Sequence, residues 1–129
     1  MNKEWNVSDL APSPSWMLQV FSVKNNFVDV TPPIQPRVSW LESEWAMYNY
    51  CNPPYSNKIP WIKKAIEEMN KGKFTIMLLP QDTSAAWYHD LIVPNAEIVS
   101  FRGRLELDNG KHPRYGSMIV IFHPTVDIK

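Results

Sequence analysis

Four consecutive residues, Asn52-Pro53-Pro54-Tyr55, combine groups that can hold a planar amino group. Asn52 carries a side-chain carbonyl and Pro53 a backbone carbonyl, so two oxygens can accept the two hydrogens of one amine. The two prolines stiffen the backbone, because each pyrrolidine ring fixes φ, and the acceptors therefore need little reorganisation. Tyr55 supplies an aromatic face for stacking. The segment predicts a clamp that makes a conjugated amine more nucleophilic.

The position of this segment favours the clamp over the alternative, an ordinary surface turn. The residues "YNYC" directly before Asn52 predict a strand, and ligand sites in open α/β sheets lie outside the carboxyl ends of strands. The segment "NFVDV" at 26–30 predicts another short, buried strand. That strand places an acid, Asp29, near its end.

The hydrophobic pattern elsewhere predicts helices that alternate with strands. The predicted helices cover 13–21, 60–71 and a segment after 81 that Asp82 or Thr83 would cap; the predicted strands cover 74–80, 96–101, 104–107 and 118–122. Residues 31–47 contain three prolines and no clear period, so we expect a loop with at most one helical turn. The apolar run at 74–80 is typical of a strand covered on both faces in a parallel sheet. We expect an α/β fold whose sheet is mostly parallel, with a terminal antiparallel strand pair.

Composition limits the classes of protein that fit. The 129 residues suit a single domain spanning 1–129, and 13 basic residues balance 13 acidic ones, so no global field attracts nucleic acid or membrane. The lone Cys51 excludes an internal disulfide framework and a cysteine-based metal site. No leader precedes the first predicted helix and no apolar run approaches about 18 residues. We expect a soluble, cytoplasmic protein with no metal and no membrane association.

The stretches "CNPPYSN", "LLPQDTSAAWYHD", "FRGRLEL" and "GSMIVIF" occur in an order and spacing that resemble the phage DNA adenine-N6 methyltransferase family, a Dam-like group of phages and prophages. The resemblance covers residues 49–123. The amino-terminal third is less similar: the family has Cys-Ala after the acid of the "FVDV" strand, where this chain has Thr31-Pro32-Pro33. Only 21 residues separate Val30 from Asn52, so the segment that would hold the cofactor looks shortened.

The resemblance implies a small, trimmed Rossmann-like methyltransferase fold that takes a methyl group from S-adenosylmethionine. Adenine would be flipped out of DNA, held by Asn52 and Pro53 with Pro54 as the stiffening residue, and stacked on Tyr55. Asp29 and Asn52 would lie on the cofactor side. The alternative for Asp29 is a strand-end residue that caps the following loop.

The candidate DNA contacts all follow the motif in the sequence. Arg102 and Arg104 flank Gly103, where two guanidinium groups could clamp a phosphate; Lys58 and Arg114 could also contact the backbone of DNA. For each cation the alternative is a solvated surface position. We hypothesise a homodimer, which would cover a sheet edge and extend the contact with DNA.

Two other functions stay open at this point. A degenerate relative could keep the fold as a DNA-binding or protein-binding module without binding cofactor, as the short 31–47 segment allows. An enzyme with the same motif could methylate another amine or amide, such as a glutamine side chain. We further predict that Trp61 and Trp87 lie in the core and that His89 lies at the surface.

Overall fold

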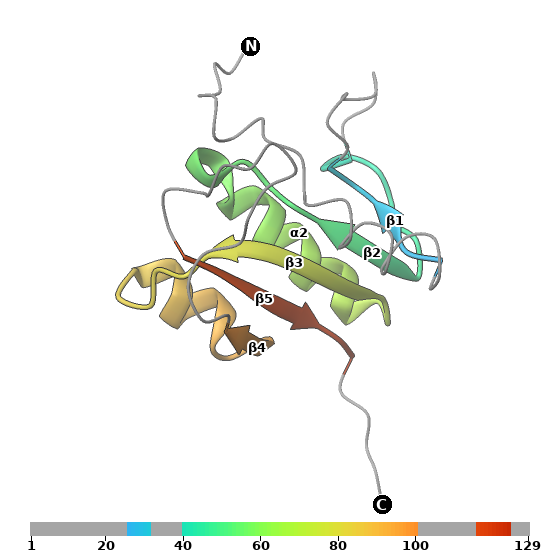
Figure 1. Cartoon of the computed structure of the whole chain (residues 1–129). Helices are drawn as coiled ribbons and strands as arrows, with labels where there is room; N and C mark the ends of the chain where they lie inside the picture. The colour runs from blue at the N-terminus through green and yellow to red at the C-terminus, as the bar shows by residue number, and fades with distance from the viewer. Residues whose placement is uncertain (1–25, 32–39, 101–115, 125–129) are drawn as a thin grey trace, which may run out of the picture.

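A five-stranded sheet in the order β1-β2-β3-β5-β4 organises the computed structural model, which describes residues 26–31, 40–100 and 116–124 (Figure 1). The strands are β1 (Val28–Asp29), β2 (Tyr48–Cys51), β3 (Phe74–Pro80), β4 (Glu97–Ser100) and β5 (Ser117–Phe122). β1, β2 and β3 run parallel, while β5 is antiparallel to both β3 and β4. The expected α/β fold, parallel at first and antiparallel at the end, is confirmed.

The partner of β3 differs from the expectation. β5 lies between β3 and β4, so β3 has a parallel neighbour on one side only. An apolar run specifies burial on both faces of a strand, but it does not specify the direction of the neighbouring strand, and here burial is satisfied by an antiparallel partner. The predicted strand at 104–107 and the predicted helix at 13–21 lie outside the described residues. In the described part of 31–47, residues 40–47 form turns and no helix, as expected.

Helix α2 (Ile59–Asn70) confirms the strongest helix prediction of the sequence. Pro60 occupies the first turn, where its missing N–H costs nothing, and Trp61, Ile62 and Ala65 are buried along one stripe. The helix ends at Asn70, and Gly72, just beyond the cap residue Lys71, adopts φ 96° and donates its N–H to the Met69 carbonyl. Figure 1 shows α2 running along one face of the sheet beside β2 and β3.

The core lies between the sheet and its helices. Alternate residues of β3 and β5 point toward α2 and are fully or almost fully buried: Met77, Leu79, Met118, Val120 and Phe122. Trp61 is 4% exposed and belongs to this core, as predicted, and Ile92 joins it from a single-turn π-helix, η4 (Tyr88–Ile92).

The predicted cap of the helix after β3 is wrong. Helical structure begins at 86, beyond both predicted capping residues, Asp82 and Thr83, and η4 has no side-chain cap. The Asp82 carboxylate instead accepts a hydrogen bond from the Ser84 hydroxyl at 3.2 Å. His89 is exposed, as expected, and one ring nitrogen contacts the Thr83 carbonyl at 2.8 Å.

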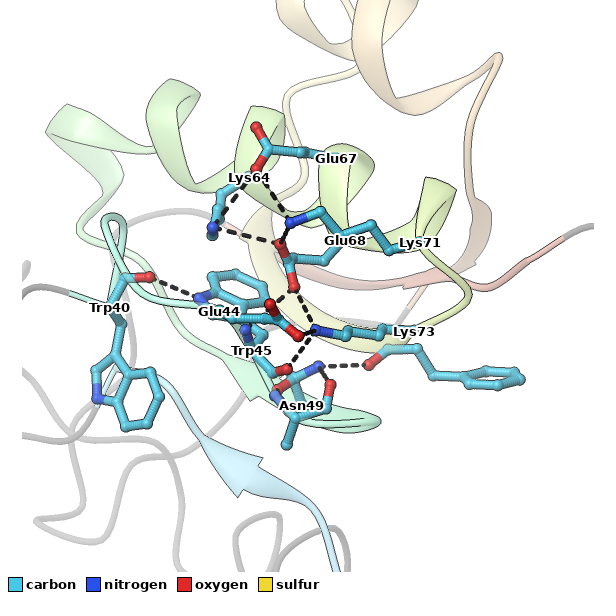
Figure 2. Close-up of polar contacts among 11 residues, drawn as sticks. Trp40, Glu44, Trp45, Asn49, Lys64, Glu67, Glu68, Lys71 and Lys73 are labelled. Carbon is cyan, nitrogen blue, oxygen red and sulfur yellow. Dashed lines mark hydrogen bonds and ion pairs between the residues drawn. The ribbon is translucent and has the colours of Figure 1, made fainter.

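A buried carboxylate fastens the amino ends of β2 and β3 to the end of α2 (Figure 2). Glu68 accepts hydrogen bonds from the Trp45 backbone N–H at 3.1 Å and from the Lys73 ammonium at 2.9 Å. Its other oxygen contacts Lys71 at 3.1 Å and Lys64 at 3.3 Å. We call Glu68 and these four partners the Glu68 network. The network lies at the amino ends of β2 and β3, and the predicted site residues lie at the other end of the sheet, where β1 and β2 finish.

Candidate functional site

The parallel pairing of β1 and β2 brings two predicted site residues to the same edge of the sheet. Asp29 lies opposite Tyr50, and the Val30 N–H donates to the Tyr50 carbonyl at 2.9 Å. Asn52 follows two residues later, directly after β2. The acid and the amide, which come from separate segments of the sequence, therefore lie at neighbouring strand ends, where α/β sheets bind ligands.

Thr31 connects these two residues through its hydroxyl. The Asn52 N–H donates to Thr31 Oγ1 at 2.6 Å, and the Thr31 hydroxyl donates to Asp29 Oδ1 at 3.3 Å. The Thr31 N–H donates to the same Asp29 oxygen at 2.9 Å, which is the bond of an Asx turn. Asp29 thus caps the loop after β1, as the alternative interpretation of this residue predicted.

The carboxylate of Asp29 keeps one oxygen for another donor. Both of its hydrogen bonds reach Oδ1, and Oδ2 accepts none from the described residues. Burial raises the pKa of Asp29, and the backbone and hydroxyl bonds from Thr31 partly offset that rise. A half-buried carboxylate oxygen at a strand end can accept a hydrogen bond from a hydroxyl or ammonium group of a ligand.

Cys51 separates Asn52 from the rest of β2 and does no chemistry of its own. The side chain is free of any disulfide and fully buried. Burial raises the pKa of the Cys51 thiol well above its usual range, the nearby Asp29 charge raises it further, and the Thr31 hydroxyl offsets part of the rise. The thiol is therefore protonated at neutral pH and is a poor nucleophile.

The Asn-Pro-Pro-Tyr segment is a tight connection between β2 and α2. Pro53 and Pro54 are buried, and residues Tyr55–Asn57 form a single 3-10 turn, η3, in which the Asn57 N–H donates to the Pro54 carbonyl at 3.0 Å. Lys58 precedes α2, and its ammonium donates to the Tyr55 carbonyl at 2.9 Å. The backbone that carries the predicted clamp is consequently held on both sides.

Lys58 also reaches the segment that follows β3. Its ammonium lies 5.0 Å from the centroid of the Trp87 ring, within the range of a cation–π interaction. Trp87 is half-buried and packs against the edge of the core, whereas the sequence predicted that it lies within the core. The segments after β1, β2 and β3 are thereby linked.

Sequence reasoning missed two features of this site. The bond between Thr31 and Asn52 depends on the pairing of β1 with β2, although a hydroxyl two residues after an aspartate was a visible turn signal. The Lys58–Trp87 contact joins residues with no shared local pattern. Of the other predicted DNA contacts, Arg102, Arg104 and Arg114 lie outside the described residues.

In residues 26–31, 40–100 and 116–124, no three His, Cys, Asp or Glu side chains gather in a group that could hold a metal ion. No helix within the same ranges is long and apolar enough to cross a bilayer.

A trimmed Rossmann-like sheet, with an acid and an Asn-Pro-Pro-Tyr turn at the carboxyl ends of adjacent parallel strands, defines the class of the α/β methyltransferases. Within it, the chain belongs to the DNA N-6-adenine-methyltransferase (Dam) family, whose sequence model matches residues 11–127. The family predicted from the sequence motifs is confirmed. Membership implies a methyl donor.

Two curated phage proteins are similar to the chain. A DNA N-6-adenine-methyltransferase of Haemophilus phage HP1 is 28% identical over 148 residues, covering 95% of this chain and 83% of the relative. A DNA N-6-adenine-methyltransferase of Escherichia phage T1 is 36% identical over 74 residues, covering 56% of this chain and 31% of the relative. That match spans about a third of the T1 protein. No solved structure matches the chain.

Proposed function

We propose that this protein transfers a methyl group from S-adenosylmethionine to the N6 amino group of adenine in DNA. The observation that carries the proposal is the rigid Asn-Pro-Pro-Tyr turn at the carboxyl end of β2, joined through Thr31 to the acid at the end of β1. Family membership and the names of both phage relatives support the same acceptor.

Each residue of the turn has a role in activating the amine. The exocyclic nitrogen of adenine is a weak nucleophile because its lone pair is delocalised into the ring. The Asn52 side-chain carbonyl and the Pro53 backbone carbonyl accept its two hydrogens, which localises the lone pair as the nitrogen becomes tetrahedral. Pro54 keeps the turn stiff, and the Tyr55 ring stacks on the flipped base.

The opposite side of the site holds the methyl donor. When bound, S-adenosylmethionine supplies an electrophilic methyl group. Asp29 accepts a hydrogen bond from the donor with the oxygen that is not used by Thr31, and Asn52 borders both ligands. The carboxylate is at a strand end, close enough to the catalytic turn to be linked to it by one side chain.

Replacing the catalytic amide tests the proposal. Asn52→Ala removes one of the two acceptors, and we expect incorporation of labelled methyl into adenine-containing DNA to fall by about 100-fold or more. Circular dichroism should be unchanged. Asn70→Ala, at the exposed end of α2, is the matched control and should retain wild-type activity. If Asn52→Ala kept nearly wild-type activity, the catalytic role of Asn52 would be contradicted.

Calorimetry separates the two alternatives. A binding module without cofactor would give no heat with S-adenosylmethionine or with its demethylated product. An enzyme with another acceptor would bind S-adenosylmethionine but transfer no methyl to DNA. Our proposal requires both binding and transfer to the N6 position, which mass spectrometry of the digested DNA identifies.

A further inference from the structure

We infer that Thr31 is a positioning residue that sets the catalytic amide against the cofactor-side acid. The inference rests on the proposed function and adds a residue that touches neither substrate. Thr31 lies at the end of β1, and its hydroxyl is half-buried between Asp29 and the backbone of Asn52.

The hydroxyl is used in both of its capacities. It accepts the Asn52 N–H at 2.6 Å, slightly shorter than the usual range of about 2.7–3.2 Å, and it donates to Asp29 Oδ1 at 3.3 Å. One oxygen atom therefore joins a residue from the end of β1 to a residue from the end of β2. The connection spans 21 positions of the sequence.

A loop cap alone does not account for this hydroxyl. The Asx turn at Asp29 needs only the backbone N–H of Thr31, which almost any residue would supply. The side chain adds the contact with Asn52, and this contact reaches the backbone of the residue whose carbonyl would hold the adenine amine. Fixing that N–H fixes the direction in which the Asn52 side chain leaves the main chain.

The same hydroxyl also orients the acid. With Oδ1 held by the N–H and the hydroxyl of Thr31, the carboxylate of Asp29 is fixed in rotation, and Oδ2 is left for the methyl donor. In a direct transfer, donor and acceptor must align before reaction, and a misplacement of about 1 Å can cost about 100-fold in rate. Thr31 holds the groups on the two sides in one arrangement.

Two substitutions at Thr31 separate positioning from simple packing. Thr31→Val keeps the shape and loses the hydroxyl, while Thr31→Ser keeps the hydroxyl and loses a methyl group. We expect kcat of Thr31→Val to fall roughly 10- to 100-fold, with a smaller change in KM for DNA. Thr31→Ser should stay within about 3-fold of wild type. Thermal melting of both variants ensures that rates are compared well below the melting temperature.

The outcomes are distinct from those that test the proposed function. A wild-type protein that methylates no adenine contradicts the function itself. An active wild type with equal kcat in Thr31→Val and Thr31→Ser overturns the role of the hydroxyl, as does a loss in Thr31→Val that lies wholly in KM for DNA. If Thr31→Val does not fold, Thr31→Ala against Thr31→Ser gives the same comparison.

Discussion

Glu68 is a fully buried carboxylate that stays charged because of its donors. Burial by itself would raise its pKa, but the bonds from Lys73, Trp45, Lys71 and Lys64 outweigh that effect and lower the pKa from 4.5 to about 2. Four donors stabilise the buried negative charge of Glu68. If that charge is removed, the donors lose their acceptor and the folded state is destabilised. The Glu68 network therefore matters for stability rather than for catalysis.

The network gives the fold a defined acid limit. A folded pKa below the unfolded value means that the stabilisation is complete above about pH 4.5 and disappears as the pH falls toward about 2. Glu68→Gln should lower the free energy of unfolding at pH 7 by about 3 kcal/mol, because it removes the charge that pairs three lysines. Urea unfolding at pH 7, 5 and 3 measures the difference, which should shrink at the lowest pH.

The neighbouring acid on α2 is the control for this prediction. The Glu67 side chain is 61% exposed and forms ion pairs with Lys64 at 3.5 Å and with Lys71 at 3.8 Å. Glu67→Gln should change the stability by no more than about 0.5 kcal/mol. Equal effects of the two substitutions, or an effect of Glu68→Gln that does not depend on pH, would contradict the assignment.

Single residues were predictable from the sequence where a local pattern fixed their position. Asn52 lies at a strand end because "YNYC" is a short apolar and aromatic run and the prolines stop it. The role of Thr31 was not predictable, since its hydroxyl acquires Asn52 as a partner only when β1 pairs with β2. The same holds for Glu68, which the pattern placed on α2 and not at the centre of four donors.

At the scale of elements, Lys58 ties the turn after β2 to the segment after β3. The sequence predicted this lysine as a contact of the DNA backbone, and the structure gives its ammonium two partners within the protein, the Tyr55 carbonyl and the Trp87 ring. Two measurements distinguish a DNA contact from an internal contact. Removal of a phosphate contact reduces the salt dependence of DNA binding, whereas removal of an internal tie affects the geometry of the turn.

Lys58→Met keeps the length of the side chain and removes its charge. We expect kcat to fall about 3- to 10-fold, because the turn loses a tie of about 1 kcal/mol, with an unchanged salt slope of DNA binding. A double-mutant cycle with Trp87→Leu should show a coupling free energy of about 0.5–1 kcal/mol. The exposed Lys63 in the second turn of α2 provides the control, Lys63→Met. A salt slope reduced by about one, with unchanged kcat, would assign Lys58 to the DNA backbone instead.

Helices and strands were predicted correctly where the hydrophobic period of the sequence matches the burial pattern of the element. α2, β2 and β3 were all predicted because each has a strong local pattern and a proline or glycine at its boundary. The insertion of β5 beside β3 was not predicted, since nothing in a doubly buried strand states whether its neighbour is parallel. The short π-helix also escaped prediction, because its hydrophobic spacing differs little from that of an α-helix.

At the scale of the whole molecule, balanced charge limits how the protein attracts DNA. With 13 basic and 13 acidic residues the chain has no net charge, so association depends on a local group of cations. Several cations are already used internally: Lys64, Lys71 and Lys73 all contact Glu68. Lys58 also contacts groups within the protein. Of the predicted DNA contacts, this leaves Arg102, Arg104 and Arg114 as candidates.

The salt dependence of the DNA-binding constant reports how many cations contact phosphates. If the three arginines contact phosphates, the logarithm of the binding constant should fall with the logarithm of salt concentration with a slope of about −3, at about 0.9 per contact. The double substitution Arg102→Ala with Arg104→Ala should bring the slope to about −1. Fluorescence anisotropy with a labelled duplex measures both values. A slope that the two substitutions leave unchanged would remove these arginines from the interface.

The proposed homodimer remains a prediction at this scale. β1 and β4 are the two outer strands of the sheet in the described residues, and either could pair with a second copy. Sedimentation of the protein, free and bound to DNA, determines whether such pairing takes place.

The buried thiol of Cys51 has a consequence for the durability of the site. It is the chain's single cysteine, it sits directly before the proposed catalytic amide, and its pKa lies well above the usual range. Peroxides and disulfides react with thiolates, and this sulfur is neither ionised nor reachable while β2 is paired. Burial and the raised pKa therefore disfavour oxidation of Cys51 in the folded protein, so peroxide should leave unmodified the thiol that adjoins the proposed catalytic amide.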